Sequence, residues 1–473
     1  MNAAERVYVS SASDGEITSR LAEELARRIE DDIVSRDLAP GGALGSLREL
    51  GQRYSVGRSV AREALGLLER RGLGKLRPGP CGGFIFARPQ PDTIGEQLAD
   101  YFRATGVRLH QLLDAREAVD LAAARLAAAA RIDSTHLARL EAAGTTTDLA
   151  GALSARIEIA HLADQPVLLM FVQCLNSLTL DFASAGVQLP ARERRVRPAV
   201  VTLARALRAR NVDAVVDATH RAHKELAARL VERASPGAPL LAASRLPTAG
   251  GTLASSIART LAAEILSTSR AGTRLGSEWD LCERFNVSRL TLRQAVRLLQ
   301  DSGLIDCRRG RGNGLVVRER RAPGAIRLML AYLIGEKMDP MAAGTILFQI
   351  NCNVPALAVA RADVQNRQAL EAALLRVESC DPFDRLDLLD LVQCVSRVAD
   401  SPIIDLFSRG LAAYEARFRA SLTERLPACA QASYFRLVRR LLDRLPVGDR
   451  SELEWAKAES SALMVDMSLR RPI

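Results

Sequence analysis

The first strong pattern in the chain is an apolar residue at every fourth position of residues 21–33. These positions are Leu21, Leu25, Ile29 and Ile33. Such a spacing predicts one apolar stripe along a helix. The run Pro40-Gly41-Gly42 ends this helix, and Ser46 is typical of the N-cap of a second, short helix that reaches Tyr54. The segment therefore predicts two helices joined by a tight connection.

A third helix and two short strands are expected next. The helix runs from about Arg58 to Arg70, and its apolar stripe consists of Ala61, Ala64, Leu65 and Leu68. Gly72 ends the helix, and two β-like runs at 73–76 and 84–87 flank a turn rich in glycine and proline. Three helices followed by a hairpin predict a winged helix-turn-helix.

The same pattern returns later in the chain. Leu44-Gly45-Ser46 recurs as Leu275-Gly276-Ser277, and Val56-Gly57-Arg58 matches Val287-Ser288-Arg289 at the same offset of 231 residues. Further downstream, residues 163–166 match residues 399–402 at an offset of 236. A slow drift of this kind is what loop insertions produce. The repeats predict two copies of one unit, joined head to tail.

Composition shifts divide the chain into four domains and a linker. Residues 235–251 are small, rich in proline and glycine, and charged only at Arg245, which is typical of a linker. After each predicted wing the pattern becomes almost entirely helical. We expect a winged helix-turn-helix at 14–88, a helical domain at 92–234, the linker, a second winged helix-turn-helix at 252–318 and a second helical domain at 326–470. The expected fold class is mainly α.

Charge and composition narrow the class of protein. The chain has 65 basic and 55 acidic residues, an excess that attracts polyanions but also serves solubility. Its eight cysteines form no C-x-x-C pair, so neither a zinc ribbon nor a disulfide framework is expected. We expect no signal peptide and no membrane span, and hence a cytoplasmic, nucleoid-associated protein. Without a phosphate loop or a catalytic constellation, neither an enzyme nor a cofactor is expected.

Arginines lie opposite the apolar stripe of each third helix. Arg58 and Arg62 are four residues apart, and Arg289 and Arg293 repeat this arrangement. A helix fits the major groove of DNA, where arginines near its N-terminus can bind guanine edges or phosphates. An exposed arginine face is often only solvated. Its occurrence in both copies, each followed by a glycine-containing wing, favours DNA binding.

The motifs that carry this arrangement resemble the GntR-family signature. They are residues 44–50, 56–65, 72–73 and 78–79 in the first copy, and 275–277, 285–289, 292–295, 303–304 and 309–310 in the second. The resemblance implies DNA contacts from the starts of the second and third helices and from the wing tip. The residues concerned are Arg48, Arg58, Ser59, Arg62, Gly79, Ser288, Arg289, Thr291, Arg293, Arg309 and Gly310. Because Trp279 replaces Arg48, the second copy is expected to read a different half-site or to read it more weakly.

The helical domains resemble the FCD effector domain of the FadR branch, by the motifs at 114–116, 163–166 and 211–213. That branch often holds a metal through one aspartate and three histidines, beside a pocket for a small carboxylate. Here those places fall on Ala152, Arg156 and a residue near Val200, and only His223 matches, so no metal is expected. Arg156 and His223 are the candidates for binding an acidic effector. The alternative is that Arg156 forms a salt bridge or is solvated.

The expected function is that of a sequence-specific DNA-binding transcriptional regulator, repressor or activator, which responds to a small acidic ligand. The alternative is a DNA-bound protein–protein adaptor that has no ligand or metal site. Either the two copies pair within one chain as a pseudo-dimer, or two chains form a homodimer with four DNA-binding domains. The sequence leaves both arrangements open.

Overall fold

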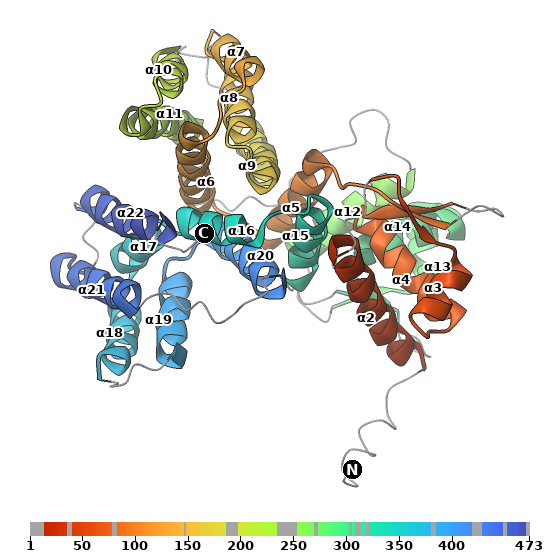
Figure 1. Cartoon of the computed structure of the whole chain (residues 1–473). Helices are drawn as coiled ribbons and strands as arrows, with labels where there is room; N and C mark the ends of the chain where they lie inside the picture. The colour runs from red at the N-terminus through yellow and green to blue at the C-terminus, as the bar shows by residue number, and fades with distance from the viewer. Residues whose placement is uncertain are drawn as a thin grey trace. The chain divides into compact units, whose positions relative to one another are not determined.

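The computed structural model describes residues 14–35, 40–77, 83–145, 148–185, 197–233, 253–268, 273–301, 305–307, 314–317, 322–379, 385–418, 428–447 and 452–469. The chain forms two compact units. Figure 1 labels its helices and colours them along the chain, from red at the N-terminus to blue at the C-terminus. Unit 1 comprises Met1–Ile94 with Arg327–Met338, and unit 2 comprises Gly95–Ile326 with Asp339–Ile473. Helices make up most of the described residues, which confirms the mainly α fold class. The division into four domains stays a prediction.

The first winged domain, in unit 1, has three helices and a three-stranded antiparallel sheet of order β1-β3-β2. The elements are α2 (Asp14–Ser35), β1 (Ala43–Gly45), α3 (Leu47–Arg53), α4 (Arg58–Arg70), β2 (Gly74–Arg77) and β3 (Gly83–Phe86). Ser46 begins α3 with a capping box, since its hydroxyl accepts from the Glu49 amide and the Glu49 carboxylate accepts from the Ser46 amide. Strand β1 was not expected from the sequence.

The core of this domain differs from the expected stripe at one end. Leu25, Ile29 and Ile33 are buried, but Leu21 is 48% exposed and Ala22 is fully buried in its place. A small alanine permits a close approach between α2 and α4, which pack together. Arg71, at the end of α4, also binds α2 because its guanidinium donates to Glu30 at 2.6 Å and to Glu23 at 2.7 Å.

A segment far downstream in the sequence completes unit 1. Helix α15 (Pro323–Gly335) contributes its residues from Arg327 onward. Arg327 pairs with Glu23 at 2.9 Å, and Glu336, just after the helix, pairs with Arg88 at 3.4 Å. A Cβ atom on Gly335 would lie only 2.5 Å from Cδ of Pro89. Glycine at this position therefore allows α15 to pack closely against the first winged domain.

The second winged domain, in unit 2, repeats these elements with a sheet of order β4-β6-β5. They are α12 (Leu253–Thr268), β4 (Arg274–Gly276), α13 (Glu278–Phe285), α14 (Arg289–Asp301), β5 (Ile305–Cys307) and β6 (Leu315–Val317). Its core includes Ile257, Leu261 and Ile265, which recur at every fourth position as the stripe of α2 does. Leu253, four residues before Ile257, is exposed as Leu21 is in the first domain, and Ala254 is buried beside it.

The rest of unit 2 consists of helices from two stretches of the chain. The first helical segment contains α5 (Pro91–Thr105), α6 (Leu109–Ala129), α7 (Ser134–Ala143), α8 (Leu149–Leu162), α9 (Pro166–Ala185), α10 (Arg197–Arg208) and α11 (Val212–Arg233). The second helical segment contains α16 (Pro340–Ile350), α17 (Val354–Arg361), α18 (Val364–Ser379), α19 (Arg385–Val398), α20 (Pro402–Phe418), α21 (Ala428–Arg444) and α22 (Leu453–Leu469). Helix α6 packs against α8, α9 and α11, and in the second segment α16 and α17 together pack against α19, α20 and α22.

The two helical segments pack directly against each other, because α6 contacts α16 and α20. Phe171 of α9 stacks on Phe407 of α20 with ring centroids 3.8 Å apart and planes 6° apart, and both side chains are fully buried. Asp114 of α6 accepts from Arg361, and Arg125 donates to Ser461 at 2.7 Å. Apolar and polar contacts thus join the segments.

Two stretches, Pro166–Ser184 and Pro340–Arg361, are long and apolar enough to cross a membrane, although the sequence analysis expected none. About two thirds of the first and nearly three quarters of the second are buried inside the protein, at 67% and 72%. The second stretch is also interrupted between α16 and α17. Both are core helices of the packed segments.

Candidate nucleic-acid interface

The recognition helix of the first winged domain, α4, presents its predicted DNA-binding residues to solvent. Arg58, Ser59 and Arg62 are exposed, whereas the opposite stripe is fully or almost fully buried. Arg48 is exposed on the neighbouring helix α3. Within the described part of the chain, no hydrogen bond or ion pair holds these three arginines. Their guanidinium groups are thus available to an incoming anion.

The recognition helix of the second winged domain, α14, differs in the contacts of its arginines. Ser288 precedes it and caps it, since its hydroxyl accepts from the Thr291 amide at 3.2 Å. The Arg289 guanidinium lies 5.2 Å from the centroid of the exposed Trp279 ring, and Arg293 Nε donates to Glu278 Oε2 at 3.0 Å. Both arginines therefore contact the domain's own side chains. The wing residues Gly79, Arg309 and Gly310 lie outside the described residues.

Comparisons with known proteins assign these domains to a family. The model of the "Bacterial regulatory proteins, gntR family" matches residues 21–80 and 253–315. Two segments of the chain, one in each winged domain, thus match the gntR family. The family resemblance inferred from the sequence is thereby confirmed for both winged domains.

Similar proteins include two curated gntR-family regulators that share the name HTH-type transcriptional repressor NanR. The protein from Klebsiella aerogenes is 35% identical over 95 residues, covering 19% of this chain and 36% of the relative. The protein from Cronobacter sakazakii is 38% identical over 80 residues, covering 17% and 30%. The chain thus spans about a third of each relative's length. Among solved structures, Streptococcus agalactiae GntR is 18% identical with a TM-score of 0.33, covering 46% of this chain and 99% of that one.

The candidate effector residues lie in the interior of the first helical segment. Arg156 is buried, and its Nε donates to Asp120 Oδ2 at 2.7 Å while its two Nη atoms donate to the carbonyls of Ala152 and Ala222. The salt bridge that was the alternative for Arg156 is therefore present. Burial lowers the pKa of His223 to about 4, so this imidazole is neutral near pH 7. Its Nδ1 atom has no hydrogen-bond partner among the described residues.

Arg116 is a polar residue whose importance the sequence analysis missed. It is completely buried and donates from Nη2 to Asn176 and Thr179 of α9. Its Nε and Nη1 atoms, and Oδ1 of Asp120, have no hydrogen-bond partner among the described residues. Burial lowers the pKa of Arg116 to about 9. Buried donors are normally satisfied by protein, water or a ligand, so these groups could receive a small anion.

Glu117 connects this polar cluster to the second helical segment. Its carboxylate accepts from Lys457 of α22 at 2.8 Å and lies 3.3 Å from Nδ1 of His220. Burial alone would raise the pKa of Glu117, but His220 and Lys457 together lower it to about 2. The described residues contain no group of three or more metal-ligating side chains.

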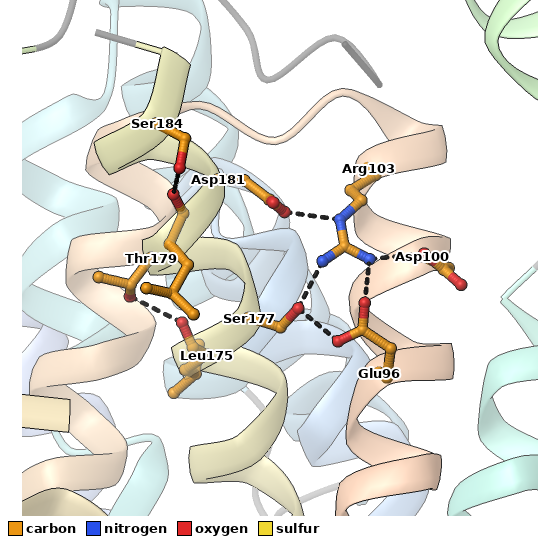
Figure 2. Close-up of polar contacts among 9 residues, drawn as sticks. Glu96, Asp100, Arg103, Leu175, Ser177, Thr179, Asp181 and Ser184 are labelled. Atoms are coloured by element: carbon orange, nitrogen blue, oxygen red, sulfur yellow. Dashed lines mark hydrogen bonds and ion pairs between the residues drawn. The ribbon is translucent and has the colours of Figure 1, made fainter. Parts of the chain in front are cut away.

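Helix α5, which follows the first winged domain, is attached to α9 by a second polar cluster. Figure 2 shows the Arg103 guanidinium between Glu96 and Asp100 of its own helix and Asp181 and Ser177 of α9. A Cβ atom on Gly95 would lie 2.8 Å from Cβ of Gln173, so the two helices pack closely. Helix α9 thus contacts both α5 and Arg116.

Proposed function

We propose that the protein is a transcriptional regulator that binds a DNA operator through both of its winged domains. The observation that supports this most strongly is the occurrence of two gntR-family domains in one chain, each with exposed arginines at the start of its recognition helix. The net charge of +10 adds a general attraction to DNA. The name of the curated relatives favours repression over activation. A cytoplasmic location agrees with this role.

The proposed DNA contacts are those at the starts of the second and third helices and at the wings. They are Arg48, Arg58, Ser59, Arg62, Gly79, Ser288, Arg289, Thr291, Arg293, Arg309 and Gly310. An N-terminal arginine of a helix in the major groove reaches guanine through two hydrogen bonds. The exposed positions of Arg58, Arg62, Arg289 and Arg293 on one face of their helices fit this role.

We further propose that the chain arose by duplication of a unit of the FadR branch, and that its halves pair with each other. Phe171 and Phe407 are 236 residues apart, the same offset that relates residues 163–166 to residues 399–402. Equivalent residues that stack on each other are typical of contacts across a two-fold axis. The packing of α15 in unit 1 joins the halves at a second place. One chain then supplies two readers, as a homodimer would.

Selection of bound DNA from a random library tests the main proposal. Wild-type protein should enrich a two-part site, and the double variants R58A/R62A and R289A/R293A should each lose a different part. The double variant R208A/R409A is the matched control, because it removes two exposed arginines that lie outside the winged domains. If no sequence is enriched at moderate salt, sequence-specific DNA binding is wrong.

For the effector, we propose that a small carboxylate binds at Arg116, beside Arg156 and His223. Arg116 has two donors without a partner among the described residues, and a second buried guanidinium, that of Arg156, contacts the same carboxylate, Asp120. A panel of mono- and dicarboxylates should raise the melting temperature of wild-type protein but not of Arg116→Met. Arg208→Met, an exposed substitution, should keep the response.

The second candidate function is a DNA-bound adaptor whose helical segments bind a protein and no small ligand. Each nitrogen of the Arg156 guanidinium already has a bond within the protein, which favours this alternative for Arg156. If no carboxylate changes the melting temperature or operator affinity, the adaptor becomes the better proposal.

A further inference from the structure

Three of the differences between the two recognition surfaces, at positions related by the offset of 231 residues, change the chemistry of the surface most strongly. Leu47, Arg48 and Ser59 in the first winged domain correspond to Glu278, Trp279 and Leu290 in the second. All six residues lie at or near the starts of the second and third helices, the same edge of each domain. Together these exchanges remove the cation of Arg48, add the anion of Glu278 and place two large apolar side chains, Trp279 and Leu290, on the surface.

Glu278 gives Arg293 a hydrogen-bond partner that the corresponding arginine of the first domain, Arg62, does not have among the described residues. Its carboxylate accepts from Arg293 at 3.0 Å, whereas the corresponding Leu47 offers no acceptor to Arg62. This bond engages Nε alone, so Arg293 could bind a guanine with its two Nη groups only by keeping the Glu278 carboxylate beside the groove or by leaving it. The carboxylate would then remain close to the DNA backbone, where like charges repel each other. Glu278 therefore disfavours guanine recognition by Arg293.

The remaining two exchanges favour contacts of another kind. Trp279 is 63% exposed and holds the Arg289 guanidinium over its ring, which fixes one arginine in place. Leu290 is 70% exposed, although it stands where the first domain has the polar Ser59. An apolar side chain on a recognition helix suits the methyl group of thymine, the one apolar group that a base presents in the major groove.

We propose that the second winged domain recognises a half-site of different sequence from the first, with Glu278 restraining Arg293 and Leu290 selecting thymine. This proposal rests on the proposed function, namely that both winged domains bind DNA. The operator of one chain is then asymmetric, with a stronger half-site for the first domain and a weaker one for the second.

The test isolates the second domain by disabling the first in the full chain. In an R58A/R62A background, DNA selected from a random library should contain thymine at the base pair that Leu290 contacts. It should differ from the half-site selected by R289A/R293A protein. Adding Glu278→Leu should free Arg293, enrich guanine at one position and tighten binding on the order of tenfold. Adding Leu290→Ser should remove the thymine preference and leave the guanine positions unchanged.

Two further variants separate misfolding from a failed proposal. Glu278→Gln removes the charge but keeps a side chain of the same size, and should give a smaller gain than Glu278→Leu. The reciprocal Leu47→Glu, in an R289A/R293A background, should weaken binding by the first domain. Identical half-sites for the two domains, or folded Glu278 variants with unchanged affinity and preference, would overturn the proposal while DNA binding stands. If wild-type protein enriches no DNA, the proposed function itself has failed.

Discussion

The stacked pair Phe171 and Phe407 allows a quantitative test of how the two helical segments pair. Each ring is fully buried, so replacing either by alanine should cost about 3–5 kcal/mol of stability, from lost burial and the cavity left behind. Phe407→Ala should cost more than Phe171→Ala, because Phe102 also packs edge-on against the Phe407 ring, with centroids 6.0 Å apart. Both variants weaken the same interface.

The double variant gives the direct interaction energy between the rings. Aromatic pairs contribute about 0.5–1.5 kcal/mol beyond burial, and the nearly parallel rings should lie towards the lower end because their faces carry like partial charge. The cost of the double variant should therefore fall below the sum of the single costs by about 0.5–1 kcal/mol. Phe84→Ala combined with Phe407→Ala is the control, since Phe84 belongs to unit 1 and should show no such coupling.

Amide hydrogen exchange in α9 and α20 is the suitable measurement, because a chain of several domains need not unfold in one step. The experiment is run at two protein concentrations. Pairing within one chain makes the protection independent of concentration, whereas pairing between chains makes it rise with concentration. Strictly additive costs would refute the contact between the rings. Protection that rises with concentration would refute pairing in cis.

Three further predictions concern other contacts. Gly335→Ala should lower the stability of unit 1 by about 1–3 kcal/mol, because its Cβ would collide with Pro89; Gly324→Ala, which meets nothing within 4 Å, is the control in a thermal melt. Arg103→Gln should destabilise the packing of α5 on α9 by about 2–4 kcal/mol, because it leaves the nearly buried carboxylate of Asp181 without its partner. The measurement is faster hydrogen exchange in α5. The control Arg409→Gln, in an exposed ion pair, should cost under about 0.5 kcal/mol. Glu117→Gln should remove about 3 kcal/mol of pH-dependent stability. The pKa of Glu117 is lowered from 4.5 to about 2, so this stabilisation is present above pH 4.5 and is lost as the pH falls towards 2. Urea melts from pH 7 to 3 should therefore show wild type and variant converging in acid, and parallel curves would contradict the role of Lys457 and His220.

The winged domains could be predicted from the sequence because local signals agree there. The Ser46 N-cap, the apolar stripe of α4 and the turn glycines all act over a few residues. The stripe of α2 was predicted wrongly at Leu21. A spacing of four residues is compatible with either Leu21 or the neighbouring Ala22 on the buried face of the helix. The sequence contains no local sign that α15 packs in unit 1, since that contact joins residues more than 200 positions apart.

The candidate effector site was predicted only in part, for a similar reason. Arg156 and His223 were found by their places relative to motifs, but nothing local marks Arg116 as fully buried with unsatisfied donors. Arginine is among the residues least expected in a core, and only the tertiary packing of α6 on α9 places it there. Likewise, the contact of Lys457 with Glu117 depends on two helices 340 residues apart.

The unlike residues at the edges of the two winged domains have a consequence for orientation. A symmetric dimer on a palindrome looks the same from either end of the DNA, so neither neighbouring gene is distinguished. A single chain with Arg48 in one winged domain and Trp279 in the other binds DNA with two different ends. Bound to its operator as proposed, it would face one direction along the chromosome, and inverting the operator would exchange which flank each half of the protein meets.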